Sequence, residues 1–192
     1  MYKLCKSEQS AARQRQLEKG LLAAMQASRY ENINVSDLCQ QMGIPRKSFY
    51  RYFAGKDGAL HALIDHTLKE YETYTGTHKQ ERRTLVGDLE QYFLFWVEQK
   101  DLLDALERSS LSGILIERSI SHAISETVFP GRFLPSESRI MQQHVVTFAV
   151  CGLMTMMLQW HHGGYRETPR SLAMVAQRLL TQPLFPDAAV LL

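Results

Sequence analysis

Basic, aromatic and hydroxyl side chains crowd into the eleven residues from Arg46 to Lys56. Arg46 and Lys47 carry donors that suit the N7 and O6 acceptors of guanine, and Ser48 is small enough to allow close approach to a base edge. Phosphate oxygens accept from charged and hydroxyl donors, and this contact is assigned to Tyr50, Arg51, Tyr52 and Lys56. The segment therefore indicates a surface that binds nucleic acid.

The distribution of charge along the chain also favours binding of nucleic acid by its first third. Residues 1–60 contain ten Lys or Arg and five Asp or Glu, a net charge of +5, whereas residues 61–192 contain twelve and fifteen, a net charge of −3. A basic first third on an acidic remainder is typical of a polyanion-binding module joined to a body that does not bind. Chance asymmetry is the alternative explanation.

Two helices are expected ahead of the basic segment. The first covers residues 7–28, because Leu17, Leu21, Ala24 and Met25 fall on one helical stripe. The second covers residues 35–42. Asn34 is a suitable N-cap for it with Asp37 at the third position, and Gly43 follows its end, where left-handed backbone favours glycine.

The basic residues themselves belong to a third short helix, which opens after Ile44-Pro45 and runs to Tyr52. Phe49 and Phe53 are spaced i, i+4 and are expected to face the core, leaving the charged side chains outside. Two short helices joined by a tight glycine turn have the layout of a helix-turn-helix, whose second helix enters the major groove. The alternative is a basic amphipathic helix that merely faces solvent.

The segment from Asn34 to Asp57 resembles the signature of the TetR family of transcriptional regulators. The residues that fit the family pattern are Val35, Leu38, Gly43, Ile44, Phe49, Tyr50, Tyr52, Phe53, Lys56 and Asp57. Four residues depart from the pattern: Asn34, Pro45, Lys47 and Ala59. These departures are compatible with the predicted fold, but the operator sequence does not follow from the resemblance. The expected DNA-contacting residues are Asn34, Ser36, Pro45, Arg46, Lys47, Ser48, Tyr50, Arg51, Tyr52 and Lys56.

The rest of the chain also shows helical periodicity, so the predicted fold is all-α, with about nine helices in total. Residues 1–60 are assigned to a three-helix DNA-binding domain and residues 61–192 to a larger helical effector-binding and dimerisation domain. Further helices are expected at residues 56–75, 83–98, 102–108, 111–128, 137–161 and 169–180.

In the resembled family the last two long helices pair with those of a second subunit, and residues 137–161 and 169–180 occupy that place. Small and apolar residues on them are the expected dimer interface: Ala149, Gly152, Met156, Ala173, Ala176 and Leu180. A two-fold dimer would present two recognition helices about one DNA turn apart and would require a palindromic operator. A helix buried within the monomer is the alternative.

Aromatic and sulfur-containing side chains are dense between residues 92 and 160. They suggest a plastic pocket for a small apolar or amphipathic effector. Phe93, Trp96, Phe148 and Cys151 are the expected lining, with His122 and His144 as polar tips. Ordinary core packing is the alternative for each of them.

Other classes of protein find less support. No Gly-x-Ser-x-Gly, phosphate-cradling loop or paired carboxylate site stands out, so we expect no enzyme and no cofactor. The adjacent His161 and His162 point to different helix faces, so no metal site is expected. Scattered cysteines, the lack of a signal peptide, and an apolar stretch, 145–158, too short to span a bilayer suggest a cytoplasmic protein without a membrane anchor.

The sequence thus predicts a sequence-specific transcriptional regulator that binds double-stranded DNA as a homodimer, with repression by a small-molecule-responsive mechanism as the family default. The alternative is a DNA-tethered adaptor or activator controlled by a protein partner. A ligand-sized cavity in the second domain would favour the first reading, and a filled core would favour the second.

Overall fold

The computed structural model describes residues 2–3, 5, 7–77, 84–125 and 139–182. Within that part of the chain the regular structure is helical, apart from an isolated antiparallel bridge between Tyr2 and Phe53. Its nine α-helices confirm the prediction of an all-α fold with about nine helices. The helix ends expected at Arg83, Val128 and Glu137 lie outside the described residues.

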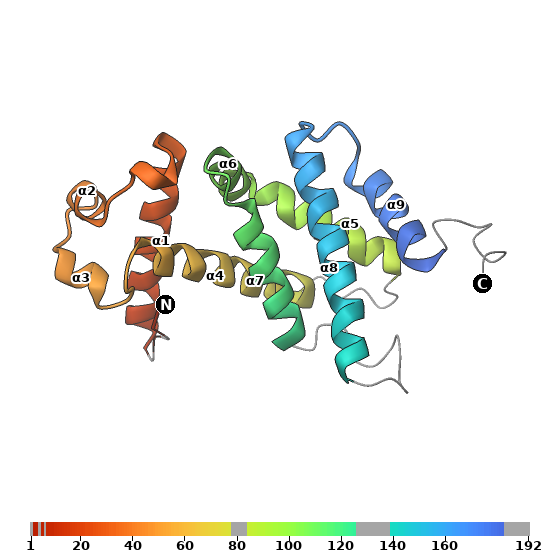
Figure 1. Ribbon diagram of the computed structural model, residues 1–192, viewed down its shortest axis with the longest axis horizontal. Coiled ribbons are helices and arrows are strands. Elements are labelled where there is room, and N and C mark those ends of the chain that lie inside the picture. The colour runs from red at the N-terminus through yellow and green to blue at the C-terminus, as the bar shows by residue number, and fades with distance from the viewer. Residues whose placement is uncertain (1, 4, 6, 78–83, 126–138, 183–192) are drawn as a thin grey trace.

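Three helices and a 3₁₀ turn form one end of the molecule, on the left in Figure 1. They are α1 (Glu8–Ala27), the turn Tyr30–Asn32, α2 (Val35–Gln41) and α3 (Arg46–Tyr50). Ser7 caps α1 by accepting from the Ser10 amide, a contact typically worth about 1 kcal/mol. Leu17, Leu21 and Met25 of the predicted stripe are fully buried, so α1 is the central support of this end.

The remaining helices follow to the right in Figure 1. They are α4 (Lys56–Thr77), α5 (Leu85–Glu98), α6 (Lys100–Arg108), α7 (Ser112–Ser125), α8 (Arg139–His162) and α9 (Pro169–Thr181). Thr84 and Thr168 cap α5 and α9 through their hydroxyls. Where the predicted end lies among the described residues, the observed end coincides with it or differs by at most two residues, which is the usual uncertainty of helix ends.

Helix α4 joins the two ends of the molecule. It packs against α1 on one side and against α5 and α7 on the other, and its residues Leu60, Leu63, Ile64 and Leu68 are buried as the sequence predicts. The boundary that we expect at residue 60 therefore falls inside α4, close to its beginning. The buried apolar residues on both sides of it form one continuous cluster.

The contacts of α8 leave much of this helix exposed. It packs chiefly on α7, whereas α9 packs chiefly on α5. By length and composition α8 is the one helix in the described part of the chain that is long and apolar enough to cross a membrane, a property that core helices of soluble proteins share. Its last turns are anchored within the monomer, because Trp160 and His161 are buried.

Candidate functional site

The α2–turn–α3 unit owes its geometry to local signals in the sequence. The Asn34 side chain accepts from the Asp37 amide at 2.9 Å and thereby begins α2. Gly43 has φ +62°, a conformation that side chains with a Cβ disfavour. The amide of Ile44 donates to the Cys39 carbonyl at 2.9 Å, closing the turn. The chain thus turns within a few residues, and α3 starts directly after Pro45.

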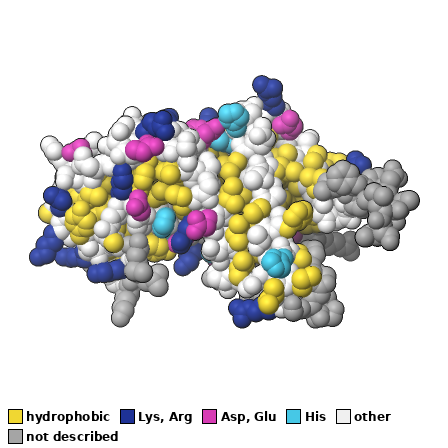
Figure 2. All heavy atoms as spheres, in the orientation of Figure 1, with side chains coloured by type: hydrophobic (Ala, Val, Ile, Leu, Met, Phe, Trp, Pro, Cys, Tyr) yellow, Lys and Arg dark blue, Asp and Glu magenta, His cyan; other side chains and the backbone are white. Residues whose placement is uncertain are grey.

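Aromatic side chains on the buried side of α3 hold this helix in place. Phe49 is fully buried and Phe53 is 1% exposed, with ring centroids 5.2 Å apart. Arg46, Lys47 and Arg51 are exposed on the opposite side, and Lys and Arg side chains gather at this end of the molecule in Figure 2. The five-residue helix therefore presents cations outward from a rigid base, which is an arrangement suited to a polyanion.

The other predicted DNA contacts divide into exposed and buried positions. Asn34, Ser36 and Pro45 are exposed and Ser48 is half-buried; Tyr50 is also exposed, and its ring lies under the Arg46 guanidinium at 5.9 Å. Tyr52, by contrast, is only 9% exposed and packs on Phe53. Its ring belongs to the core rather than to the surface that α3 presents.

The predicted phosphate contact of Lys56 does not agree with the structure. Its ammonium donates to the backbone carbonyls of Tyr30, Glu31 and Ile33 at 2.7, 3.2 and 2.8 Å, and lies 4.5 Å from the centre of the Tyr30 ring. An ammonium has three donors, and all three are engaged. The side chain thus fastens the start of α4 to the turn after α1, and we withdraw it from the phosphate contacts.

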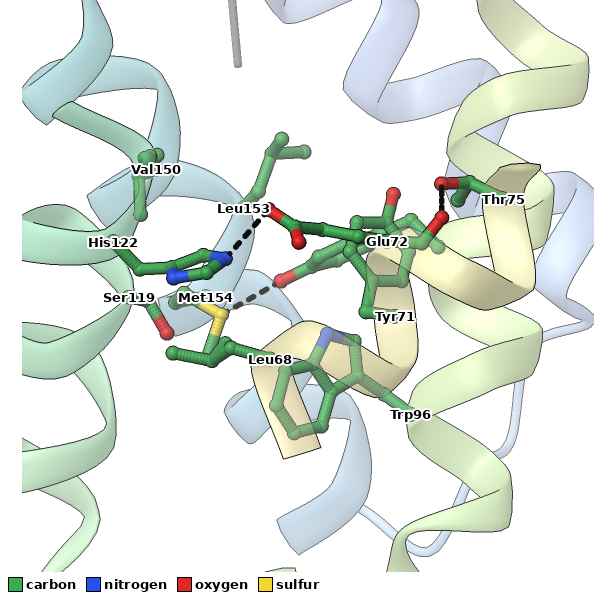
Figure 3. A pocket seen from close by; sticks show the side chains of 12 residues that line it. Leu68, Tyr71, Glu72, Thr75, Trp96, Ser119, His122, Val150, Leu153 and Met154 are labelled. Atoms are coloured by element: carbon green, nitrogen blue, oxygen red, sulfur yellow. Dashed lines mark hydrogen bonds and ion pairs between the residues drawn. The ribbon is translucent and has the colours of Figure 1, made fainter. Parts of the chain in front are cut away.

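A cavity of about 340 Å³ lies between α4, α5, α7 and α8. Its volume is at the lower end of the range of about 300–1,000 Å³ that small-molecule sites occupy. Figure 3 shows the side chains that converge on it from these helices. The lining residues are Leu68, Tyr71, Glu72, Thr75, Tyr92, Trp96, Ser119, His122, Ala123, Val150, Leu153 and Met154.

Trp96 and His122 were expected in this pocket and line it. The other four expected residues do not line it. Phe93 is fully buried and packs edge-on against Trp160, so it belongs to the solid core. Phe148 is 71% exposed; His144 is exposed and Cys151 is half-buried. The structural reason is that the cavity face of α8 carries Val150, Leu153 and Met154 instead.

Helix α4 contributes four lining residues that the sequence analysis missed. The signal was present, because Leu68, Tyr71, Glu72 and Thr75 follow the spacing i, i+3, i+4, i+7 of one helix face. The predicted lining residues all lie on later helices, between Phe93 and Cys151. Since α4 also supports the α2–α3 end, a ligand in the cavity would contact an element shared by both parts of the molecule.

Polar groups in the cavity are incompletely satisfied. Trp96 Nε1 and Ser119 Oγ are buried without a hydrogen-bond partner, and leaving one such group unpaired costs about 1–3 kcal/mol. The Tyr92 hydroxyl donates to Met154 Sδ at 2.9 Å, a weak acceptor. Burial, and then the charge of Tyr71, raise the pKa of Tyr92 well above its ordinary value, whereas the Trp96 side chain lowers it.

A second candidate surface is the outer face of α8 and α9. On α8, Met141, Val145, Phe148, Gly152 and Thr155 are all exposed, and their alternating spacing of four and three residues is that of a coiled-coil seam. The large apolar side chains exposed on both helices are Ile140, Met141, Val145, Phe148, Met174, Val175, Leu179 and Leu180.

The predicted dimer residues are only partly on this face. Gly152 and Leu180 are exposed, and Ala149 and Met156 are half-buried. Ala173 and Ala176 are 0% and 1% exposed, which corrects their assignment. They face inward because α9 packs on α5 of the same chain, and small side chains permit that close packing.

Two sets of polar contacts join the two ends of the molecule. Arg118 of α7 forms an ion pair with Asp65 of α4, with Nε–Oδ1 at 2.6 Å, and Tyr2 donates to the same carboxylate at 2.6 Å. Burial and then the bond to Asp65 raise the pKa of the Tyr2 hydroxyl. The second set runs from α6 to the end of α1.

In that second set, Arg108 donates to the carbonyls of Met25 and Gln26, and the Tyr30 amide donates to Ser109 Oγ at 3.0 Å. Both sets depend on how α6 and α7 lie relative to α1 and α4. A shift of the helices around the cavity would therefore disturb contacts with the α1–α3 end.

Comparison with known proteins shows similarity of fold alone. No protein-family model and no curated protein matches the chain. Among solved structures, the fatty acid degradation regulator FadR from Bacillus halodurans is similar, with a TM-score of 0.60, 13% identity, and coverage of 94% of this chain and 98% of that one. The dihydroxyacetone kinase operon activator DhaS has a TM-score of 0.56, 15% identity, and coverage of 88% and 93%.

The chain thus has the all-α fold of a class of transcriptional regulators, and this similarity extends over nearly the whole length of both neighbours. Both neighbours are described as regulators.

Proposed function

We propose that the chain is a sequence-specific DNA-binding transcriptional regulator of the TetR family, with a DNA-binding domain up to about residue 60 and an effector-binding and dimerisation domain beyond it. The observation that carries the proposal is the α2–turn–α3 unit. There, buried Phe49 and Phe53 hold a short helix whose outward side carries Arg46, Lys47 and Arg51. Arg46 and Lys47 read base edges in the major groove, and Arg51 contacts phosphate.

The protein acts in the cytoplasm as a homodimer on a palindromic operator. Support for the dimer is the exposed apolar face of α8 and α9, where Phe148 is 71% and Met174 is 58% exposed. Large apolar side chains that gather on an exposed face often mark a site of interaction with another protein. The seam-like spacing on α8 suits the packing of two such helices against their copies.

Repression is relieved by a small apolar or amphipathic effector. The cavity of about 340 Å³ supports this part of the proposal, because a regulator that responds only to a protein partner needs no internal space. An adaptor or activator controlled by a protein partner is the second candidate, and one structural neighbour is described as an operon activator. The ligand-sized cavity favours the effector-responsive regulator.

The mechanism is a shift between two populations of the dimer. An effector in the cavity contacts α4, which also packs on α1. Movement of α4 and α7 strains the Arg118–Asp65 pair and changes the spacing of the two α3 helices. By linkage, operator DNA weakens effector binding by the same factor as the effector weakens DNA binding. Equal effector affinity with and without operator would contradict the mechanism.

The decisive test is selection of bound duplexes from a random DNA library by the purified full-length protein, followed by sequencing. The expected result is an inverted repeat whose half-sites are separated by about one helical turn. The variant Arg46→Ala, Lys47→Ala is the matched control, since both side chains are exposed and their loss leaves the core intact. An enriched motif that survives in this variant, or no motif with binding only at low salt, would refute base reading by α3.

A further inference from the structure

The cavity between α4, α5, α7 and α8 supplies hydrogen-bond donors that the protein itself leaves without good acceptors. Trp96 Nε1–H is a donor on a side chain only 1% exposed, and it has no partner. Ser119, 5% exposed, has an unpaired hydroxyl. The Tyr92 hydroxyl donates to the thioether of Met154, which is a weak acceptor. Buried donors in native proteins are normally paired, so this group indicates an occupant with acceptor atoms.

The charges of the cavity restrict what that occupant can be. None of the described lining residues is Lys or Arg. The carboxylate Glu72 accepts from or pairs with His122 Nε2 at 2.9 Å, so the one basic ring in the lining already has an anionic partner. A carboxylate or phosphate would meet a negative side chain without a free cation to balance it. The acceptor atoms therefore belong to a neutral group.

The rest of the wall is apolar and fixes the shape of the occupant. Tyr71 and Tyr92 pack edge-on with ring centroids 5.8 Å apart, and Tyr92 packs on Trp96 at 6.3 Å. Leu68, Val150 and Leu153 also line the cavity (Figure 3). Flat aromatic and branched aliphatic surfaces favour a compact ring system over a polar or highly flexible molecule.

We propose that the cavity binds a neutral, compact, mostly apolar molecule whose carbonyl oxygen accepts from Trp96 Nε1–H and Ser119 Oγ–H. This inference rests on the proposed function in taking the occupant as the effector, but the binding chemistry stands on the cavity alone. Neutral ligands are preferred over anions because the described lining residues include no Lys or Arg. A ketone is preferred over a hydrocarbon because Trp96 and Ser119 can donate to its oxygen.

Four probes that share one bicyclic skeleton test the chemistry: 1-indanone, indane, indane-1-carboxylate and 1-aminoindane, which is a cation at neutral pH. Two-dimensional ¹H–¹⁵N spectra of the full-length protein report on the indole N–H groups directly. The chain has two tryptophans, and Trp160 Nε1 already donates to the Glu167 carbonyl at 3.0 Å, so it serves as an internal control. Trp96→Phe assigns the two signals.

The expected result is a downfield shift of the Trp96 indole proton with 1-indanone, beyond any shift with indane, and little change at Trp160. Ring-current effects of the skeleton are common to both probes, so the difference between them isolates the hydrogen bond. Equal shifts with indane and 1-indanone would overturn the assignment of Trp96 as a donor to the ligand.

Calorimetric titration tests the second donor. Ser119→Ala is expected to weaken 1-indanone binding about five- to tenfold, in line with the loss of one hydrogen bond, and to leave indane binding unchanged. Ser121→Ala is the matched control, because Ser121 is exposed on the same helix. An equal effect of both substitutions on 1-indanone, or tighter binding of the carboxylate or the amine than of the ketone, would overturn the proposal. Failure of 1-indanone to bind the folded protein would overturn it as well.

The same samples separate this inference from the proposed function. Selected operator DNA is titrated with protein in the presence and absence of each probe. If 1-indanone binds as described and DNA affinity does not change, the ligand chemistry holds and effector control fails. If DNA affinity responds to indane-1-carboxylate and not to 1-indanone, effector control holds and the ligand chemistry is wrong.

Discussion

Replacing Lys56 with methionine separates a structural role from a DNA contact at this residue. The substitution keeps the apolar stem and removes the ammonium. Three backbone carbonyls, those of Tyr30, Glu31 and Ile33, then lose their donor, and the Tyr30 ring loses the cation 4.5 Å from its centre. All of these groups lie in the connection between α1 and α2, so the loss falls on the support of the α2–α3 end.

The size of the effect follows from the contacts. A hydrogen bond to a charged group contributes about 1.5–3 kcal/mol, and a cation over an aromatic ring about 0.5–1 kcal/mol at an exposed site. The three bonds share one ammonium, and Glu31 is exposed to water, so they do not add fully. We expect a total loss of about 2–3 kcal/mol, which corresponds to a fall in Tm of about 5–10 °C for a chain of this size.

Thermal unfolding by circular dichroism and DNA binding at several salt concentrations are measured on the same samples. Lys47→Met is the matched control, because Lys47 is exposed on α3. It should leave Tm nearly unchanged and reduce the slope of log affinity against log salt by about one unit if the ammonium contacts phosphate, or relax base preference if it reads a base. Lys56→Met should lower Tm and leave both the salt slope and the base preference unchanged.

The reasoning is refuted if Lys56→Met unfolds at the wild-type temperature and reduces the salt slope by about one unit. The ammonium would then be free to leave the three carbonyls and bind phosphate, as the sequence analysis expected. A lowered Tm together with an unchanged salt slope at a temperature where the variant is folded supports the structural role.

Three other substitutions test separate parts of the interpretation. Arg46→Ala should cost about 1–3 kcal/mol and relax preference at one base pair in the selection experiment, and uniform weakening across sequences would reassign it to phosphate. Phe148→Glu should convert the dimer to monomer in sedimentation equilibrium because it places a charge on the exposed α8 face, and a persistent dimer would exclude that face. Burial, then the charges of Asp104 and Glu107, raise the pKa of Tyr165 to about 12. The stability that wild type gains over Tyr165→Phe should therefore be constant below about pH 10 and disappear as the pH rises through 12, and a difference independent of pH in denaturant titrations would contradict this.

The α1–α3 end could be predicted closely because its determinants are local. Asn34 caps α2 by bonding three residues ahead, Gly43 supplies the positive φ of the turn, and the i, i+4 spacing of Phe49 and Phe53 sets which side of α3 is buried. Each of these signals acts over a few residues. They are therefore visible in the sequence without knowledge of the rest of the fold.

The role of Lys56 could not be predicted in the same way. Its partners are carbonyls 23 to 26 residues earlier in the chain, and every residue has a carbonyl, so no side-chain pattern identifies them. A lysine at the start of a helix beside a basic segment has the same sequence signal whether it meets phosphate or the backbone of its own chain. Only the path of the chain decides between the two.

The residues of the pocket and of the dimer face could be predicted only in part, and on α8 the reason is the lack of a polar side. Where one side of a helix is polar, periodicity identifies the buried side. On α8 the cavity residue Val150 and the exposed residue Phe148 are both apolar, so the sequence does not fix the rotation of the helix about its axis. Ala173 and Ala176 show the same ambiguity, since small residues suit packing on α5 as well as packing on a second chain.

The absence of a polar side on α8 nevertheless has a physical consequence for the proposed mechanism. Leu153 and Met154 line the cavity, whereas Val145 and Phe148 are exposed on the face assigned to the dimer. A helix moves as a rigid rod over such distances, so an occupant that displaces Met154 also displaces the seam nearby. Together with α4, which joins the cavity to α1, this gives one ligand two routes to the spacing of the α3 helices. Coupling between cavity and DNA in the proposed dimer then requires no chain of individually tuned residues, because two of the cavity walls are α4, which packs on α1, and α8, which carries the proposed dimer face.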